Sequence, residues 1–365
     1  MLAYIVRRLL LIIPTLLGIM VINFVIINMA PGGPIEQLIA NLRQGGDQVA
    51  ERTGSSRGQE AGVGQQERQP GEQSRAGRGL DPELLEKLRK QLNLDKPPHE
   101  RFVLMVANYA AFDFGQSFFK NRPVVDLVLE KMPVSISLGL WTTLIVYLVC
   151  IPLGIRKAVR DGSAFDIWTS GVVVVANAIP GFLFAIMLVI LFATGAVFQW
   201  FPLKGLVSEN FSELSTAGQV LDYLWHIALP VLALVIGGFA ALTLLTKNSF
   251  LEEINKQYVV TARAKGMGER RVLYGHVFRN AMLIVIAGFP GAFIGILFTG
   301  SLLIEIIFNL DGLGLLGFEA IVNRDYPVVF ATLFFFSLIG LLVKLITDLT
   351  YIWVDPRIDF EARQA

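Results

Sequence analysis

Residues Ile227–Thr246 read IALPVLALVIGGFAALTLLT, a run of twenty residues without one charged side chain. The hydrocarbon core of a bilayer is about 30 Å thick and is crossed by a helix of roughly 20 mostly apolar residues. This run therefore predicts a membrane-spanning helix. It is followed at once by Lys247, the first residue of a long polar segment.

Five further stretches of the chain meet the same criterion of length and apolar composition. They are Leu9–Met29, Ser135–Ile155, Gly171–Phe198, Met282–Ile304 and Val328–Ile346. The composition agrees with this count, because 54% of the 365 residues are hydrophobic and 17% are charged, against about 25% charged in a typical soluble domain. The sequence predicts an all-α integral membrane protein with six transmembrane helices.

The placement of basic residues predicts the orientation of these spans. Arg7 and Arg8 precede the first span, so the positive-inside rule places the N-terminus in the cytoplasm. Alternation then puts most basic residues of the short loops inside and leaves the short outer loops mainly acidic. The even number of spans returns the C-terminus, residues 351–365, to the cytoplasm. Because the first run is too long for a cleaved signal core, residues 1–30 are interpreted as a retained signal anchor.

The longest connection is the segment 31–134, which this topology places in the periplasm. Its part 43–79 consists of Gly, Gln, Arg, Glu and Ser with almost no large apolar residue, which predicts disorder. Residues 81–92 begin with Asp81 and Pro82 and space their leucines along one face, so they predict a short helix.

Motifs of enzymes and of ion-coupled transporters are scarce in this sequence. There is no GxxxxGK phosphate loop, no GxSxG elbow and no HExxH pair, and the single cysteine excludes a Cys-based zinc site. Gly312–Gly317 matches GxGxxG by letter, but it follows a span, so we interpret it as a tight turn of the chain. The span centres lack charges, and Lys344 and Asp348, four residues apart, are expected to pair locally. The net charge of +1 offers no basic surface for nucleic acid.

Several spans contain proline, which bends a helix and is tolerated where neighbours satisfy the freed carbonyl. Pro180 in the third span is accompanied by a polar residue, Asn177. Flexible helices around a solvated path are compatible with this pattern, and Asn177 is a candidate for lining such a path.

The cytoplasmic loop 247–280 has the most informative pattern in the chain. It predicts two short helices, Glu252–Lys265 and Glu269–Asn280, separated by Gly266-Met267-Gly268, with Gly266 as a left-handed cap. The second helix would bury Val272 and Val277 and expose Arg270 and Arg271. The spacing alone leaves open whether this loop lies on lipid headgroups or docks into a partner protein.

Residues 258–266, YVVTARAKG, followed by HVFRN at 276–280, resemble the "EAA" loop of ABC-importer permeases. Val260 occupies the usual acidic position of that motif, and Arg279 stands where proline is common. Further matches are Ala30-Pro31-Gly32, Asp113-Phe114-Gly115, Gly312-Leu313-Gly314 and Arg324-Asp325-Tyr326-Pro327. These are similar to the B-type permeases of dipeptide and oligopeptide importers, and among them most similar to the Yej-type peptide importers.

The resemblance implies a fold and a set of partners. The fold would be that of a type I importer permease with a core at 135–350. The partners would be a second permease subunit, ABC ATPase subunits that bind ATP and Mg, a periplasmic peptide-binding protein, the peptide substrate and the lipid of the bacterial inner membrane. The chain itself would be neither an enzyme nor a holder of any cofactor or metal.

The resemblance also implies roles for individual residues. Docking on the ATPase would involve the motif residues Thr261, Ala262, Arg263, Ala264, Lys265, Gly266, His276 and Arg279. Asp325 and Tyr326 are candidates for a periplasmic gate or a contact with the binding protein. Alternatives are a permease for dipeptides or other small solutes, including metal chelates, and a channel without an ATPase.

Overall fold

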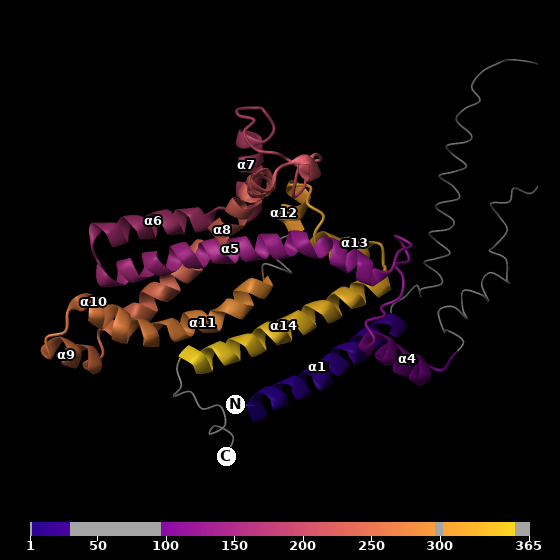
Figure 1. Cartoon of the computed structure of the whole chain (residues 1–365), viewed down its shortest axis with the longest axis horizontal. Helices are drawn as coiled ribbons and strands as arrows, with labels where there is room; N and C mark the ends of the chain where they lie inside the picture. Colours follow the sequence, from indigo (N-terminus) through magenta and orange to yellow (C-terminus); the bar gives the residue numbers. More distant parts are fainter. Residues whose placement is uncertain (1, 30–95, 296–301, 355–365) are drawn as a thin grey trace, which may run out of the picture. The chain divides into compact units, whose positions relative to one another are not determined.

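The computed structural model describes residues 2–29, 96–295 and 302–354 (Figure 1). Regular structure in these residues is helical, apart from an isolated bridge between Gln116 and Pro123. The disordered segment and the short helix expected at 43–79 and 81–92 lie outside the described residues. The chain divides into two compact units, of which the larger comprises Met1–Pro14, Asp126–Ala320 and Thr332–Ala365. The smaller comprises Thr15–Val125 and Ile321–Ala331.

Four helices are long and apolar enough to span a membrane. They are α1 (Leu2–Met29), α5 (Val124–Val159), α8 (Thr216–Ile254) and α14 (Tyr326–Val354). Each contains one of the expected spans and extends beyond it, so that α5 begins inside the segment expected to be periplasmic. Half of the most apolar window of α8 is buried inside the chain, against 11% for α1. Among these four helices, α8, which contains the run Ile227–Thr246, is therefore the most deeply buried.

The third expected span differs from the prediction of one helix over Gly171–Phe198. Two helices, α6 (Ala164–Ala178) and α7 (Gly181–Phe192), meet at an angle of 89°. Pro180 has no N–H to continue the ladder, and the residue before a proline is pushed out of the α region. Ile179 accordingly has an extended backbone, with ψ 118°. Ser163 caps α6 by accepting a hydrogen bond from the Asp166 amide.

The fifth expected span, Met282–Ile304, is described only in part. Helix α11 (Phe278–Gly295) covers its first half and α12 (Leu302–Ile307) its end, with residues 296–301 outside the described part of the chain. Two shorter helices are α13 (Leu313–Val322), which follows α12 in the chain, and α4 (Pro98–Ala110), which precedes α5. With the bent pair counted as one span, the described chain has up to five candidate spans.

Helix α8 is the centre of the larger unit, where it packs against α6, α7 and α11 (Figure 1). Its contact with α5 is close, because a Cβ on Gly154 would lie 2.6 Å from Cβ of Thr246. Small residues that let two backbones approach are typical of helix contacts in membranes. Large apolar side chains such as Trp168 and Val172 remain exposed, as expected where lipid covers the surface.

Candidate coupling loop and membrane cavity

The polar loop after α8 folds into α9 (Gln257–Ala264), α10 (Glu269–Val272) and a π-helical turn, η3 (Leu273–Val277), that continues into α11. Two helical pieces around a break are thus confirmed, but the first begins at Gln257, since α8 itself ends at Ile254. Glu253 joins the end of α8 to α9: its carboxylate accepts a hydrogen bond from Tyr258 Oη at 2.7 Å and one from Lys256. This hydrogen bond to Glu253 raises the pKa of the Lys256 ammonium.

The break between α9 and α10 is a Schellman turn. The Gly266 amide donates to the carbonyl of Arg263 at 2.9 Å, and the Met267 amide donates to that of Ala262 at 3.3 Å. Gly266 has φ +78°, in the left-handed region where residues other than glycine are strained. The predicted left-handed cap is therefore confirmed. Arg263 closes the turn with a forked pair to Glu269, at 2.9 and 3.1 Å.

The loop has a buried face and an exposed face. Val259, Ala262, Val272 and Val277 are buried in the core of the larger unit. The other motif residues that the sequence singled out are exposed: Thr261, Arg263, Ala264, Lys265, Gly266, His276 and Arg279. Ala262 thus packs inside its own chain, whereas these seven residues are exposed, as are Arg270 and Arg271. We call this exposed set the loop surface.

Asp325 and Tyr326 belong to the smaller unit, in which Asp325 is buried and Tyr326 is half-buried. Asp325 is 3% exposed. Its carboxylate accepts hydrogen bonds from Ser117 Oγ and from the amides of Phe118 and Phe119, at 3.1 and 3.3 Å. The half-buried Tyr326 stacks on Phe330, with ring centroids 6.0 Å apart. In this structure Asp325 fixes the turn at 117–119.

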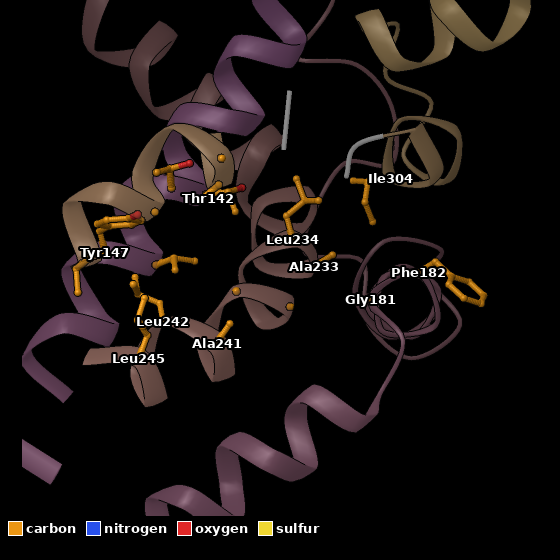
Figure 2. A pocket seen from close by; sticks show the side chains of 18 of the residues that line it. Thr142, Tyr147, Gly181, Phe182, Ala233, Leu234, Ala241, Leu242, Leu245 and Ile304 are labelled. Atoms are coloured by element: carbon orange, nitrogen blue, oxygen red, sulfur yellow. The ribbon is translucent and has the colours of Figure 1, made fainter. Parts of the chain in front are cut away.

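A cavity of about 660 Å³ lies in the larger unit and is lined by residues of α5, α7, α8, α11 and α12 (Figure 2). Its wall is mainly apolar and includes five glycines: Gly181, Gly237, Gly238, Gly288 and Gly291. The polar groups in the wall are Thr142, Thr143 and Tyr147, all from α5, and no charged side chain is among the lining residues. Asn177 is exposed at the end of α6 and does not line this cavity.

Two buried ionic groups escaped the sequence-based reasoning. Lys157, in the last turn of α5, has no exposed surface and binds Asp166 Oδ1 at 2.9 Å, while Lys247 reaches Asp166 Oδ2 at 2.7 Å. Glu305 is equally buried and accepts a hydrogen bond from the Leu315 amide at 2.7 Å. Gly312 lies against this side chain, because a Cβ there would lie 2.5 Å from the Glu305 carboxylate. A lysine shortly after a span looks like an ordinary positive-inside charge, so no local signal identifies its burial.

The pairing expected for Asp348 with Lys344 is wrong. Asp348 Oδ2 instead binds Arg8 Nη2 of α1 at 3.0 Å and accepts a hydrogen bond from Tyr4 Oη at 3.0 Å. Arg8 Nε also donates to Tyr4 Oη at 3.0 Å. The exposed Lys344 lies apart from this group of three.

Comparison with known proteins gives one family. The sequence model described as "Binding-protein-dependent transport system inner membrane component" matches residues 150–360, more than half of the chain. A "Peptidoglycan transport system permease protein YejB" of Agrobacterium fabrum is 60% identical over 364 residues, with 99% of each chain covered. An "Inner membrane ABC transporter permease protein YejB" of Escherichia coli is 57% identical, covering 99% of this chain and all of that one. An "Oligopeptide transport system permease protein AppB" of Bacillus subtilis is 32% identical over the same extents.

Proposed function

Because the chain belongs to the family of binding-protein-dependent inner membrane transport components, we propose that it forms half of a heterodimeric path for importing oligopeptides. It is a multi-pass permease subunit of an ABC importer, and the ATPase of the system is a separate chain. The second half of the path is another permease subunit. A periplasmic binding protein delivers the peptide, and the partner ATPase supplies the energy.

Peptides are the substrate class that the relatives favour. The permease of Bacillus subtilis is named for oligopeptides, and that of Agrobacterium fabrum for peptidoglycan. The second name favours one further candidate, the peptide-bearing fragments of the cell wall. Both classes contain the peptide backbone. A comparison of the import rates of free tripeptides and of cell-wall fragments distinguishes between them.

The topology that we propose has six spans, with both termini in the cytoplasm. The contact of Arg8 in α1 with Asp348 in α14 supports it, because this contact brings the start of the first span to the end of the last. Two such ends meet on one side of a membrane only if the number of crossings is even. Six is reached when the incompletely described α11–α12 segment is counted as one more span beside the four long helices and the bent pair. On this topology the segment 31–134 is periplasmic, the core is 135–350, and the residues after 350 form a cytoplasmic tail.

The observation that carries the proposed mechanism is the continuity of the coupling loop with two helices of the cavity wall. Helix α8 enters the loop and α11 leaves it, and both line the cavity. The ATPase binds the loop surface, so closure of the ATPase displaces α9 and α10. Rigid helices transmit this displacement to the cavity, and the path changes between inward-facing and outward-facing states. Arg263 in this scheme holds the break closed through Glu269 while its neighbours contact the partner.

The test is to block the loop surface without disturbing the buried face. Ala264 is exposed, so Ala264→Trp adds bulk only on the side that would contact the ATPase. We expect peptide-stimulated ATP hydrolysis by the reconstituted importer to fall by about tenfold or more, as for loss of one well-packed interface contact. The melting temperature of the purified subunit should not change.

The matched control is Ala196→Trp, an equally exposed alanine in the connection after α7. This variant should retain normal stimulation. If Ala264→Trp also retained normal stimulation and the ATPase remained bound, the loop surface would have no coupling role.

A further inference from the structure

The cavity between α5, α8 and α11 contains space that no part of the described chain uses. A Cβ built on Gly237, Gly288 or Gly291 meets no atom within 4 Å. These glycines lie inside helices, where each costs roughly 0.5–1 kcal/mol relative to alanine. By contrast, Gly238 is needed for packing, because its Cβ would lie 3.0 Å from Val146 Cγ2. The three unused positions keep the cavity wide at a cost to helix stability.

Two hydroxyl groups in the wall have no protein partner among the described residues. Thr142 is 1% exposed and Thr143 is 4% exposed, and neither Oγ1 forms a hydrogen bond. Buried polar groups in native proteins are nearly always paired, and the usual partner of a helical threonine is the carbonyl one turn earlier. Both residues line the cavity, and Figure 2 shows Thr142 in its wall together with Tyr147 one turn further along α5. A ligand in the cavity would find two free hydrogen-bonding groups there.

The volume and chemistry of the cavity fit an uncharged group of moderate size. Sites for small molecules have volumes of roughly 300–1,000 Å³ and are mainly apolar with a few placed polar groups, and this cavity has about 660 Å³. A charged side chain would find no counter-ion among the lining residues, and burying an unpaired charge is strongly unfavourable. A peptide residue offers both an uncharged side chain and a backbone amide.

We propose that this cavity is a size-limited subsite for an uncharged side chain of the transported peptide, with Thr142 and Thr143 binding its backbone. The subsite rests on the proposed function, since it specifies which part of the peptide this subunit contacts. Gly237 sets the upper limit of the side chain that passes. Alternative occupants are the second permease subunit and a lipid chain, and the experiment below separates them from a peptide.

The test is to fill the cavity at Gly237, where an added Cβ meets no atom within 4 Å. We compare import of Ala-Ala-Ala and Ala-Trp-Ala by proteoliposomes that hold the complete importer with Gly237→Leu. Import of Ala-Trp-Ala should fall about tenfold or more, the discrimination that a filled apolar pocket provides. Import of Ala-Ala-Ala should stay within about twofold of the unmodified importer. The control is Gly171→Leu, a glycine of α6 with equally open space outside the cavity.

A second variant tests the hydroxyl. Thr142→Val keeps the shape and removes the hydrogen bond, so import of both peptides should fall roughly fivefold. Thr246→Val is the matched control, because its hydroxyl is equally buried and unpaired but does not line the cavity. A Thr142→Val importer that transports both peptides normally would overturn the role of this hydroxyl.

Three results would overturn the subsite: equal loss of both peptides in Gly237→Leu, no loss of either, or release of the second permease subunit from that variant. The last would mean that the partner subunit fills the cavity. Binding of a peptide in the subsite is tested apart from the proposed function by the shift in melting temperature that Ala-Trp-Ala causes in the solubilised importer. A shift that Gly237→Leu abolishes supports the subsite even if the unmodified importer transports neither peptide.

Discussion

At the scale of the residue, Lys157 has an unusual environment for a lysine. Its ammonium is completely buried and donates hydrogen bonds to Thr169 Oγ1 at 2.8 Å and Ser170 Oγ at 2.7 Å, in addition to its pair with Asp166. Long basic side chains at the ends of spans usually extend toward water. Here the charge instead links α5 to α6.

We expect Lys157→Met to destabilise the subunit by about 3 kcal/mol, because removal of one partner from a buried ion pair leaves the remaining groups without compensation. The measurement is the melting temperature of the purified subunit in detergent. Arg160→Met is the control, since Arg160 is exposed on the same turn of the chain and its loss removes the same charge. A shift no larger than that of the control would mean that the pair contributes little.

The candidate site residues show what a motif can and cannot reveal. The resemblance picked out a contiguous run, Thr261–Gly266, and the helical period of the structure divides it by turning Ala262 inward. Asp325 was a candidate for an external contact, yet its carboxylate holds the turn at Ser117, two hundred residues earlier in the chain. Partners that far apart in sequence leave no local pattern, so neither the burial of Asp325 nor that of Glu305 was predictable.

At the scale of the element, the six apolar runs predicted where helices lie, and hydropathy was sufficient for that. Hydropathy did not predict that the third run forms two helices, α6 and α7, which are separated at Pro180. Pro14, Pro152, Pro230 and Pro290 occur inside helices that continue through them. The local chemistry of proline is the same in all cases, so the packing around each one decides whether a helix bends or breaks.

The crossing of α5 and α8 gives a prediction at this scale. Gly154→Val would place its side chain against Thr246 and against the carbonyl of Thr243, which is 2.9 Å from the ideal Cβ. The two helices would have to separate, and overpacking of this kind costs about 1–3 kcal/mol. Thermal unfolding in detergent measures the loss.

Gly171→Val is the control for helix propensity, because it makes the same change on α6 where no atom lies within 4 Å. Equal melting temperatures for the two variants would show that the close approach at Gly154 has no energetic weight.

At the scale of the whole molecule, the orientation of the spans determines on which side of the membrane each loop lies. The positive-inside rule predicted it from the loops alone. Contacts in the larger unit agree with its alternation, since Lys157 meets Lys247 through Asp166 at one end of α5, and Ser135 accepts a hydrogen bond from the Leu313 amide at the other.

Cysteine labelling tests this orientation directly. In a Cys150→Ser background, Lys204→Cys should react with a membrane-impermeant maleimide in intact cells. Arg160→Cys should react only after the inner membrane is opened. Both positions are exposed in the structure, so accessibility depends on the side of the membrane and not on burial. Labelling of Arg160→Cys in intact cells would reverse the topology.

The sequence by itself determined that this protein lies in a membrane, where its helices run and which loop resembles an ATPase-coupling motif. These properties depend on composition and on spacing within single segments, which apolar burial and helix geometry translate directly into structure. The tertiary structure alone decided that Ala262 is the buried member of the run Thr261–Gly266, how Lys157, Asp325, Glu305 and Asp348 are paired, and that glycines of α8 and α11 border an open cavity. Those properties depend on contacts between residues that are distant in the chain, and such contacts exist only once the helices have packed.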